Sequence, residues 1–170
     1  MILETSQLLS TAHRVLDGNL ITGLSKSGRK QQQYILPDSR DSVMYSATHV
    51  NHPSTIWARQ GHATYSWLYS LWMSLLNEYT HRYGKSHACE KLRVVLAKTP
   101  KNIKDSNWSQ PPQAMPDECK TNDAISAYHQ YYVMKKNHIA KWTNREIPKW
   151  YSHGILDLLT TESQVMGLYD

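Results

Sequence analysis

The stretch with the strongest structural signal runs from residue 60 to residue 83 and reads QGHATYSWLYSLWMSLLNEYTHRY. Apolar side chains recur in it at three- and four-residue steps, which is the period of one face of a helix. They are Tyr65, Leu68, Leu71, Trp72, Leu75, Leu76 and Tyr79. Gly84 follows at once, and glycine commonly ends a helix. The stretch therefore predicts a long, mainly buried helix that is rich in aromatic residues.

Two other segments have the same period. The first covers residues 1 to about 17, ends at the turn signal Asp17-Gly18-Asn19, and repeats Ile2, Leu3, Leu8, Leu9, Ala12, Val15 and Leu16. The other covers about 121–142, can be capped by Thr121 or Asn122, and repeats Ile125, Tyr128, Tyr131, Tyr132, Ile139 and Trp142. Both are predicted to be major helices.

The segments between these helices are polar or rich in proline. Residues 18–52 abound in Ser, Gln and Gly and are predicted to form a long surface loop that includes the basic run Lys26–Lys30. Residues 100–120 contain Pro111, Pro112 and Pro116 and are predicted to be an extended connector. Short helices are expected at about 86–98 and 153–160. We therefore predict an all-α fold, with residues 1–170 forming one compact bundle of three main helices, short helices and long loops.

Composition points to an anionic partner. The formal charge is +5, and the 170 residues include 11 Tyr and 6 Trp but no Phe. Tyr and Trp combine a flat ring with a hydrogen-bonding group, which suits a wet interface as well as a core, and both uses stay open. The charge favours nucleic acid first and an anionic membrane surface second.

Several function classes lack support in the sequence. No P-loop, GxGxxG or GxSxG motif is present, and His49 and His52 precede Pro53 without any HExxH or Cys/His cluster, so no cofactor or metal is expected. Cys89 and Cys119 form no CxxC pair, which favours a reducing compartment. No apolar run approaches the roughly 20 residues of a membrane span, and the first residues lack signal-peptide features. We expect a cytoplasmic protein of undetermined oligomeric state.

The C-terminal third interleaves cations with aromatic rings. The cations are Lys135, Lys136, Lys141, Arg145 and Lys149, and the rings are those of Tyr131, Tyr132, Trp142, Trp150 and Tyr151. Cations neutralise phosphates and rings stack on exposed bases, so this pattern is typical of a groove for unstacked nucleic acid. The alternative is a solvated lysine face beside a packed aromatic core.

Glu4 is the carboxylate in the first turn of the predicted first helix. The helix dipole there favours its ionised form, and the backbone of Met1 lies one turn before it. A free α-amine titrates near about 8 and is a competent nucleophile at neutral pH. Glu4 and Met1 are therefore candidate catalytic groups, and the alternative for Glu4 is a carboxylate that only stabilises the helix dipole.

Three segments resemble the pyrimidine-dimer DNA glycosylases of the T4 endonuclease V type. These are Ile2–Leu8 around Glu4, the Gly-His-x-Thr-aromatic pattern Gly61–Tyr65 at the start of the central helix, and Pro148–Tyr151 near the C-terminal end. The chain is also similar to uncharacterised phage proteins in segments 4–9, 51–59, 78–85 and 113–118. It differs from the glycosylases in carrying Leu3 and Gln7 where they have arginines.

The resemblance implies base excision from duplex DNA. The N-terminal amine, here on Met1, would attack C1′ of the damaged nucleotide and form a Schiff base, and Glu4 would assist strand cleavage. His62 would lie close to the site, and Trp150 and Tyr151 near the lesion. Two alternatives remain open: a phage protein that binds nucleic acid without catalysis, and a phage inhibitor that binds a host protein through its Tyr and Trp residues.

Overall fold

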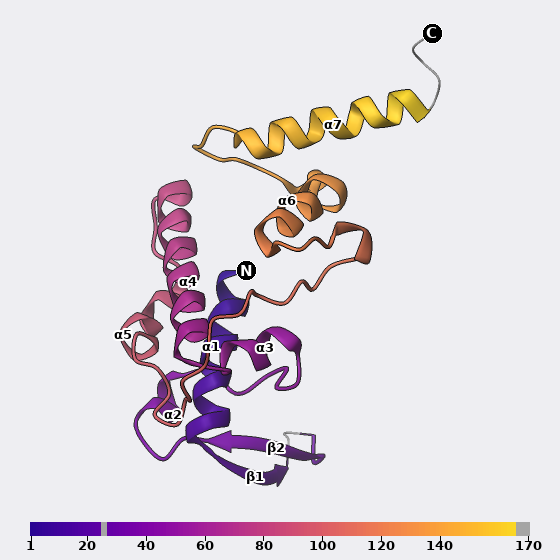
Figure 1. Cartoon of the computed structure of the whole chain (residues 1–170). Coiled ribbons are helices and arrows are strands. Elements are labelled where there is room, and N and C mark those ends of the chain that lie inside the picture. The colour runs from indigo at the N-terminus through magenta and orange to yellow at the C-terminus, as the bar shows by residue number, and fades with distance from the viewer. Residues whose placement is uncertain (25–26, 166–170) are drawn as a thin grey trace. The chain divides into compact units, whose positions relative to one another are not determined.

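The computed structural model describes residues 1–24 and 27–165 of the chain, which pack as two compact units, residues 1–111 and 112–170 (Figure 1). In the first unit the elements are α1 (Ile2–Asp17), β1 (Asn19–Leu24), β2 (Lys30–Ile35), α2 (Arg40–Val43), α3 (Pro53–Ala58), α4 (His62–Tyr83), the 3-10 turn η1 (Ala88–Leu92) and α5 (Arg93–Leu96). In the second they are η2 (Asp117–Cys119), α6 (Ala124–Lys135), η3 (Asn137–Ile139) and α7 (Lys149–Val165). The prediction of one domain over residues 1–170 stays a prediction.

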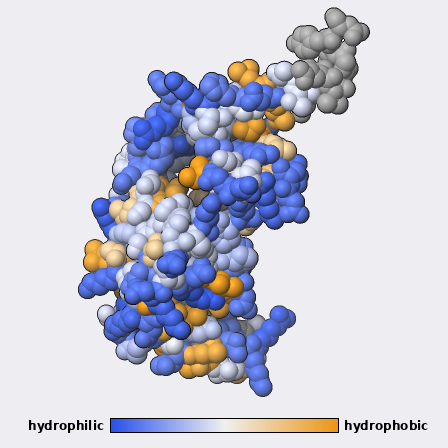
Figure 2. Space-filling model, viewed as in Figure 1, coloured by the Kyte–Doolittle hydropathy of each residue, from blue (hydrophilic) through white to orange (hydrophobic). Residues whose placement is uncertain are grey.

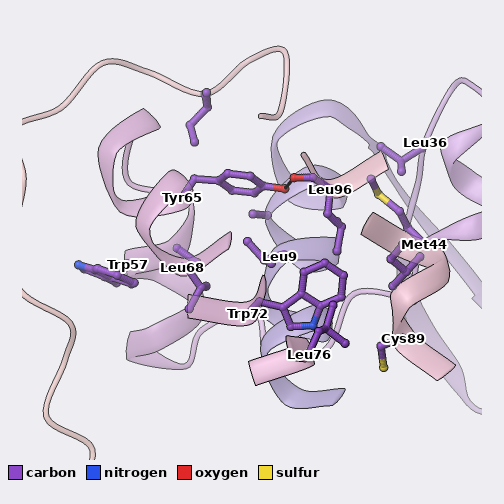
Figure 3. Close-up of a cluster of buried hydrophobic side chains, with 14 residues drawn as sticks. Leu9, Leu36, Met44, Trp57, Tyr65, Leu68, Trp72, Leu76, Cys89 and Leu96 are labelled. Atoms are coloured by element: carbon purple, nitrogen blue, oxygen red, sulfur yellow. Dashed lines mark hydrogen bonds between the residues drawn. The ribbon is translucent and has the colours of Figure 1, made fainter. Parts of the chain in front are cut away.

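The first unit is built on α1 and α4, which run antiparallel (Figure 1). Their facing sides supply Leu9, Trp72 and Leu76, of which Leu9 and Trp72 are fully buried, and Figure 3 shows these side chains meeting Leu96 and Met44 from the following segments. Burying one such side chain stabilises the fold by about 1.5–3 kcal/mol. The apolar side chains that recur in residues 60–83 thus form part of the core, and the predicted helix over this stretch is confirmed.

The ends of α4 follow from its flanking residues. Thr64 Oγ1 accepts a hydrogen bond from the Gly61 N–H at 3.3 Å and donates one to the Gly61 carbonyl at 3.0 Å, which caps the first turn. A side chain on Gly61 would clash, because its Cβ would lie 1.9 Å from Ser106 Oγ. At the other end Gly84 takes a left-handed conformation with φ of 65°, as the sequence predicted.

A buried arginine joins α1 to the segment that follows the hairpin. Arg14 donates to the carbonyl oxygens of Tyr34, Asp41, Met44 and Tyr45 at 2.6 to 3.0 Å and pairs with the Asp41 carboxylate at 2.6 Å. Its side chain is only 5% exposed. All five N–H donors of the guanidinium have acceptors. Arg14 therefore supplies hydrogen bonds to carbonyl groups of residues 34–45, a segment with little regular secondary structure.

A second polar chain crosses from α1 to α4. Arg40 Nη1 donates to His13 Nδ1 at 2.9 Å, so His13 Nε2 carries the proton and donates to Tyr65 Oη at 2.8 Å. Tyr65 Oη in turn donates to the Leu96 carbonyl at 2.9 Å, the dashed contact in Figure 3. Burial first and the Arg40 charge second lower the pKa of His13 to about 4, so the ring is neutral.

The all-α prediction is wrong, because residues 19–24 and 30–35, within the predicted loop 18–52, pair as two antiparallel strands, and the fold is mixed α/β although mostly helical. The register pairs Asn19 with Ile35 and Leu24 with Lys30. The hairpin was missed because both of its faces are solvated along most of its length, so its sequence lacks the alternation of a half-buried strand. Gly28 has a φ of 76°, which suits the turn between the strands.

The second unit packs α6 against two neighbours. On one side Met115, Cys119 and Ala127 form a small buried cluster, and Gln113 and Thr121 exchange two hydrogen bonds of 2.6 and 3.1 Å that hold the incoming chain. On the other side α7 approaches so closely that a Cβ on Gly154 would lie 2.7 Å from a methyl group of Val133. The absence of a side chain at Gly154 permits this contact.

Three predicted helix ranges need correction. The helix expected at about 121–142 is α6, which Asp123 caps by accepting from the Ser126 N–H at 2.7 Å, and which ends at Lys135. The helix expected at 153–160 is the longer α7, because Pro148 precedes it and does not interrupt it. The helix expected at 86–98 divides into η1 and α5.

Candidate nucleic-acid interface

Glu4 and Met1 lie together at the start of α1. The Thr5 N–H donates to the Met1 carbonyl at 2.8 Å, which places Met1 one turn before Glu4, and both side chains are exposed. Within the described residues no ion pair joins the Met1 amine to the Glu4 carboxylate. Both groups are accessible to a ligand, but the fold does not enclose them.

His62 lies elsewhere in the first unit. The His13–Tyr65 hydrogen bond fixes the register of the antiparallel α1 and α4. Glu4 stands nine residues before His13 and His62 three before Tyr65, so these offsets add to about 18 Å along the helices at ~1.5 Å per residue. His62 faces Asp105 instead, at 3.8 Å. The structure therefore does not bring the predicted catalytic residues together.

The Gly-His-x-Thr-aromatic pattern has a structural explanation. Gly61 accommodates the close approach of Ser106, and Thr64 caps α4. Tyr65 is 1% exposed and belongs to the buried chain with His13. Of the residues named in the pattern, only His62 has an exposed side chain.

Three of the predicted rings of the C-terminal third, those of Trp142, Trp150 and Tyr151, contact one another. The predicted cations are spread along the chain: Lys135 ends α6, Lys136, Lys141 and Arg145 follow it, and Lys149 opens α7. Lys135 and Lys136 are already engaged within the protein. Lys135 pairs with Glu118 at 3.0 Å, and Lys136 lies over the Tyr131 ring at 5.3 Å.

The rings at this corner pack against one another. His129 stacks on Trp150 with centroids 4.0 Å apart and planes within 4°, so one face of the indole is already covered. Trp142 meets the Trp150 ring at 6.0 Å and the Tyr151 ring at 5.4 Å, both nearly edge-on. Trp142, Trp150 and Tyr151 are half-buried. This geometry favours the packed-core interpretation over a stacking platform for bases.

The charge is divided unequally between the units. Residues 1–111 hold 13 Lys and Arg against seven Asp and Glu, a formal charge of +6, whereas residues 112–170 hold six against seven, a formal charge of −1. The whole positive surplus therefore belongs to the first unit. The pattern of residues 131–151 concealed this, because acidic residues stand on both sides of it in the sequence.

Most carboxylates of the first unit are already neutralised. Arg40 engages Asp17 and Asp38, and these contacts lower the pKa of both carboxyl groups, against the opposing effect of burial at Asp17. Asp41 accepts from the Leu36 N–H and pairs with Arg14, and these two contacts, in that order, lower its pKa. Glu78 pairs with Arg82 and Glu90 with Arg93. In the described part of this unit, five exposed lysines have no carboxylate within ion-pair distance: Lys30, Lys85, Lys91, Lys98 and Lys104.

A single segment concentrates part of this charge. Lys98, Lys101 and Lys104 recur every third residue after α5, and all three are exposed. The segment is fixed to α1 and α4, because Asp17 accepts from the N–H groups of Lys101 and Asn102 at 2.9 Å and the Lys104 carbonyl accepts from the His62 N–H at 3.3 Å. We call residues 98–104 the lysine segment.

Trp108 follows the lysine segment and contacts two rings from earlier helices. Trp108 meets Trp57 at 6.0 Å and Trp67 at 5.8 Å, and Trp57 meets Trp67 at 5.7 Å. Trp57 is buried and donates from Nε1 to the Ser109 carbonyl at 3.1 Å, whereas Trp67 is 36% and Trp108 48% exposed. Sequence reasoning missed this combination, because its rings come from three separate segments and converge only in the fold.

No known family model, curated protein or solved structure matches the chain. Across the described residues, no helix has the length and apolar character needed to cross a membrane. In the same residues, no three His, Cys, Asp or Glu side chains are grouped so that they could hold a metal ion.

Proposed function

We propose that this protein binds nucleic acid through the basic surface of residues 1–111. The observation that carries the proposal is the position of the charge surplus, since the first unit has a formal charge of +6 while the second has −1. Three exposed lysines line one anchored segment, and the exposed ring of Trp108, which follows it in the chain, contacts the exposed ring of Trp67. Lysines that release counterions from phosphates supply most non-specific affinity, and exposed rings add stacking.

The test is salt-dependent binding of the full chain to a labelled 20-base-pair DNA duplex. We expect the variant K98Q/K101Q/K104Q to lower the slope of log K against log salt by about 2.7, or ~0.9 for each lost phosphate contact. Affinity in 0.1 M salt should fall by about two orders of magnitude. A wild-type protein that binds no duplex at 50 mM salt, or a variant that keeps the full slope, would refute the proposal.

The narrower candidate is base excision, as the resemblance to the DNA glycosylases implies. It is favoured by the exposed Glu4 carboxylate one helical turn after Met1. The mechanism needs an amine that attacks C1′ and a carboxylate within reach of the same sugar. In this candidate His62 has no part in the chemistry, because it lies about 18 Å along the helices from Glu4.

Borohydride reduction tests this candidate, since it converts a Schiff base between protein and abasic duplex into a stable adduct. We expect an adduct with wild type and strand cleavage that Glu4→Gln reduces. His62→Gln is the matched control and should retain both activities. Intact abasic DNA with no adduct would exclude base excision but leave the binding proposal standing.

A further inference from the structure

Most of the described residues of the β1/β2 hairpin are exposed. On β1, Leu20 is 49%, Ile21 46% and Leu24 69% exposed. In Figure 2, hydrophobic residues lie among hydrophilic ones at the lower end of the view, where Figure 1 places the hairpin. An isolated two-stranded ribbon is marginally stable in water, and exposed apolar strands favour association. These features suit an element that meets a partner.

The register defines two faces of the hairpin. Gln31 pairs with Gly23 and Gln33 with Ile21, and because partners lie on the same side, these four residues form one face. Gln32 pairs with Thr22 on the opposite face. A Cβ atom placed on Gly23 would have no other atom within 4 Å, so the space beside Gln31 is open.

Charge at both ends of the hairpin favours a polyanion. Lys30 begins β2 near the turn and is exposed. At the base, Asp17 precedes β1 and Asp38 follows β2, and both contact Lys101 of the lysine segment, at 2.9 Å to its N–H and 3.5 Å to its Nζ. The base of the hairpin therefore lies beside the lysine segment, in which Lys98 and Lys104 are exposed.

We propose that the hairpin enters the major groove of duplex DNA and presents the face of Gln31 and Gln33 to adenine bases. This inference rests on the proposed nucleic-acid binding and names the element that reads the duplex. Six residues per strand give a ribbon about 20 Å long. The major groove, ~12 Å wide and ~8.5 Å deep, admits a two-stranded ribbon.

The side chains match the groove chemically. A glutamine amide can donate an N–H to adenine N7 and accept from adenine N6–H₂ through its carbonyl oxygen in the major groove. Residues two apart on a strand are separated by ~6.8 Å, and two base-pair steps span about the same distance. Gln31 and Gln33 can therefore address adenines two steps apart, while Lys30 and the lysine segment neutralise phosphates at the two ends of the ribbon.

The experiment compares binding of the full chain to A·T and G·C duplexes of 20 base pairs. We expect wild type to prefer the A·T duplex by about tenfold for each glutamine contact. Q31A/Q33A should lose this preference while keeping the salt slope, and Q32A, on the opposite face, is the matched control that should keep both. Replacing adenine by 7-deazaadenine removes the N7 acceptor and should abolish the preference for wild type.

The inference would be overturned if wild type showed no preference for the A·T duplex, or if Q32A lost the preference as fully as Q31A/Q33A. It would also be overturned if wild type kept the preference when 7-deazaadenine replaced adenine. A monomer–dimer equilibrium that Leu24→Glu abolishes, with duplex binding unchanged, would assign the hairpin to a second copy of the chain. Binding to neither duplex would instead refute the proposed function itself, so the two failures are distinguishable.

Discussion

Residues 1–111 and residues 112–170 both combine cations with aromatic rings, but in different ways. In the second unit His129 covers Trp150, and Lys135 and Lys136 contact Glu118 and Tyr131. In the first unit the arginines neutralise the carboxylates, and exposed lysines remain with formal surplus charge. Alternating cations and rings along a sequence therefore do not identify a nucleic-acid surface. What matters is whether the charges and ring faces are already engaged within the protein.

The largest expected effect concerns the buried arginine of the first unit. Arg14→Met would remove the guanidinium donor from the Asp41 carboxylate and from four carbonyl oxygens, and we expect a loss of about 3–5 kcal/mol in the free energy of unfolding. Urea denaturation followed by Trp fluorescence measures it. A change below about 1 kcal/mol would show that the Arg14 hydrogen bonds contribute little to the stability of this unit.

The matched control is Arg93→Met. Arg93 is 54% exposed and lies 3.7 Å from Glu90. An exposed ion pair of this kind contributes about 0.2–1 kcal/mol, so the control should change stability far less than Arg14→Met.

The next effect is pH-dependent. The folded pKa of His13 is about 4, because burial and the Arg40 charge disfavour the protonated ring, while the unfolded value is near 6.5. The unfolded chain alone binds this proton between these values. Stability from His13 is therefore complete above about pH 6.5 and falls by up to ~3 kcal/mol as the pH drops to about 4.

Urea denaturation at pH 7.0 and 4.5 tests this prediction. His13→Gln is the control, because an amide can both accept from Arg40 and donate to Tyr65 without titrating. The difference between wild type and His13→Gln should shrink or reverse as the pH falls. Parallel stability curves for the two proteins would show that His13 is not the titrating group.

The sequence predicted the parts of the fold that depend on local periodicity. The 3.6-residue pattern of residues 60–83 gave α4, and Gly84 gave its end. The hairpin was not predictable in this way, because its side chains face water on both sides and show no period-two pattern. The second unit was predicted less well, since Ile139 and Trp142 continue the apolar repeat in sequence although α6 ends at Lys135.

The candidate site was harder to predict than the fold. Glu4 and His62 were grouped from short motifs, but their separation depends on the register that His13 and Tyr65 set. The rings of Trp57, Trp67 and Trp108 come together only through tertiary packing. Charge balance per unit was available from the sequence, but only once the boundary near residue 111 was known.

A smaller effect is expected at the helix contact of the second unit. Gly154→Ala places a methyl group about where Val133 lies, at 2.7 Å, and should cost about 1–2 kcal/mol despite the better helix propensity of alanine. In a Val133→Ala background the same change should stabilise by up to ~1 kcal/mol. Thermal unfolding by circular dichroism of the four proteins gives the coupling. Equal effects in both backgrounds would mean that α6 and α7 do not meet at this point.

The smallest effect is expected for the lysines of the second unit. K136Q/K141Q/K149Q removes as many charges as K98Q/K101Q/K104Q, but from a unit whose formal charge is already −1. If binding resides in the first unit, duplex affinity should stay within about threefold and the salt slope should be unchanged, because no phosphate contact is lost. Fluorescence anisotropy between 50 and 200 mM salt measures both. A salt slope reduced by about 2.7 in this variant would instead show that the lysines near Trp150 contact the phosphates. The proposal that residues 1–111 carry the nucleic-acid surface would then be wrong.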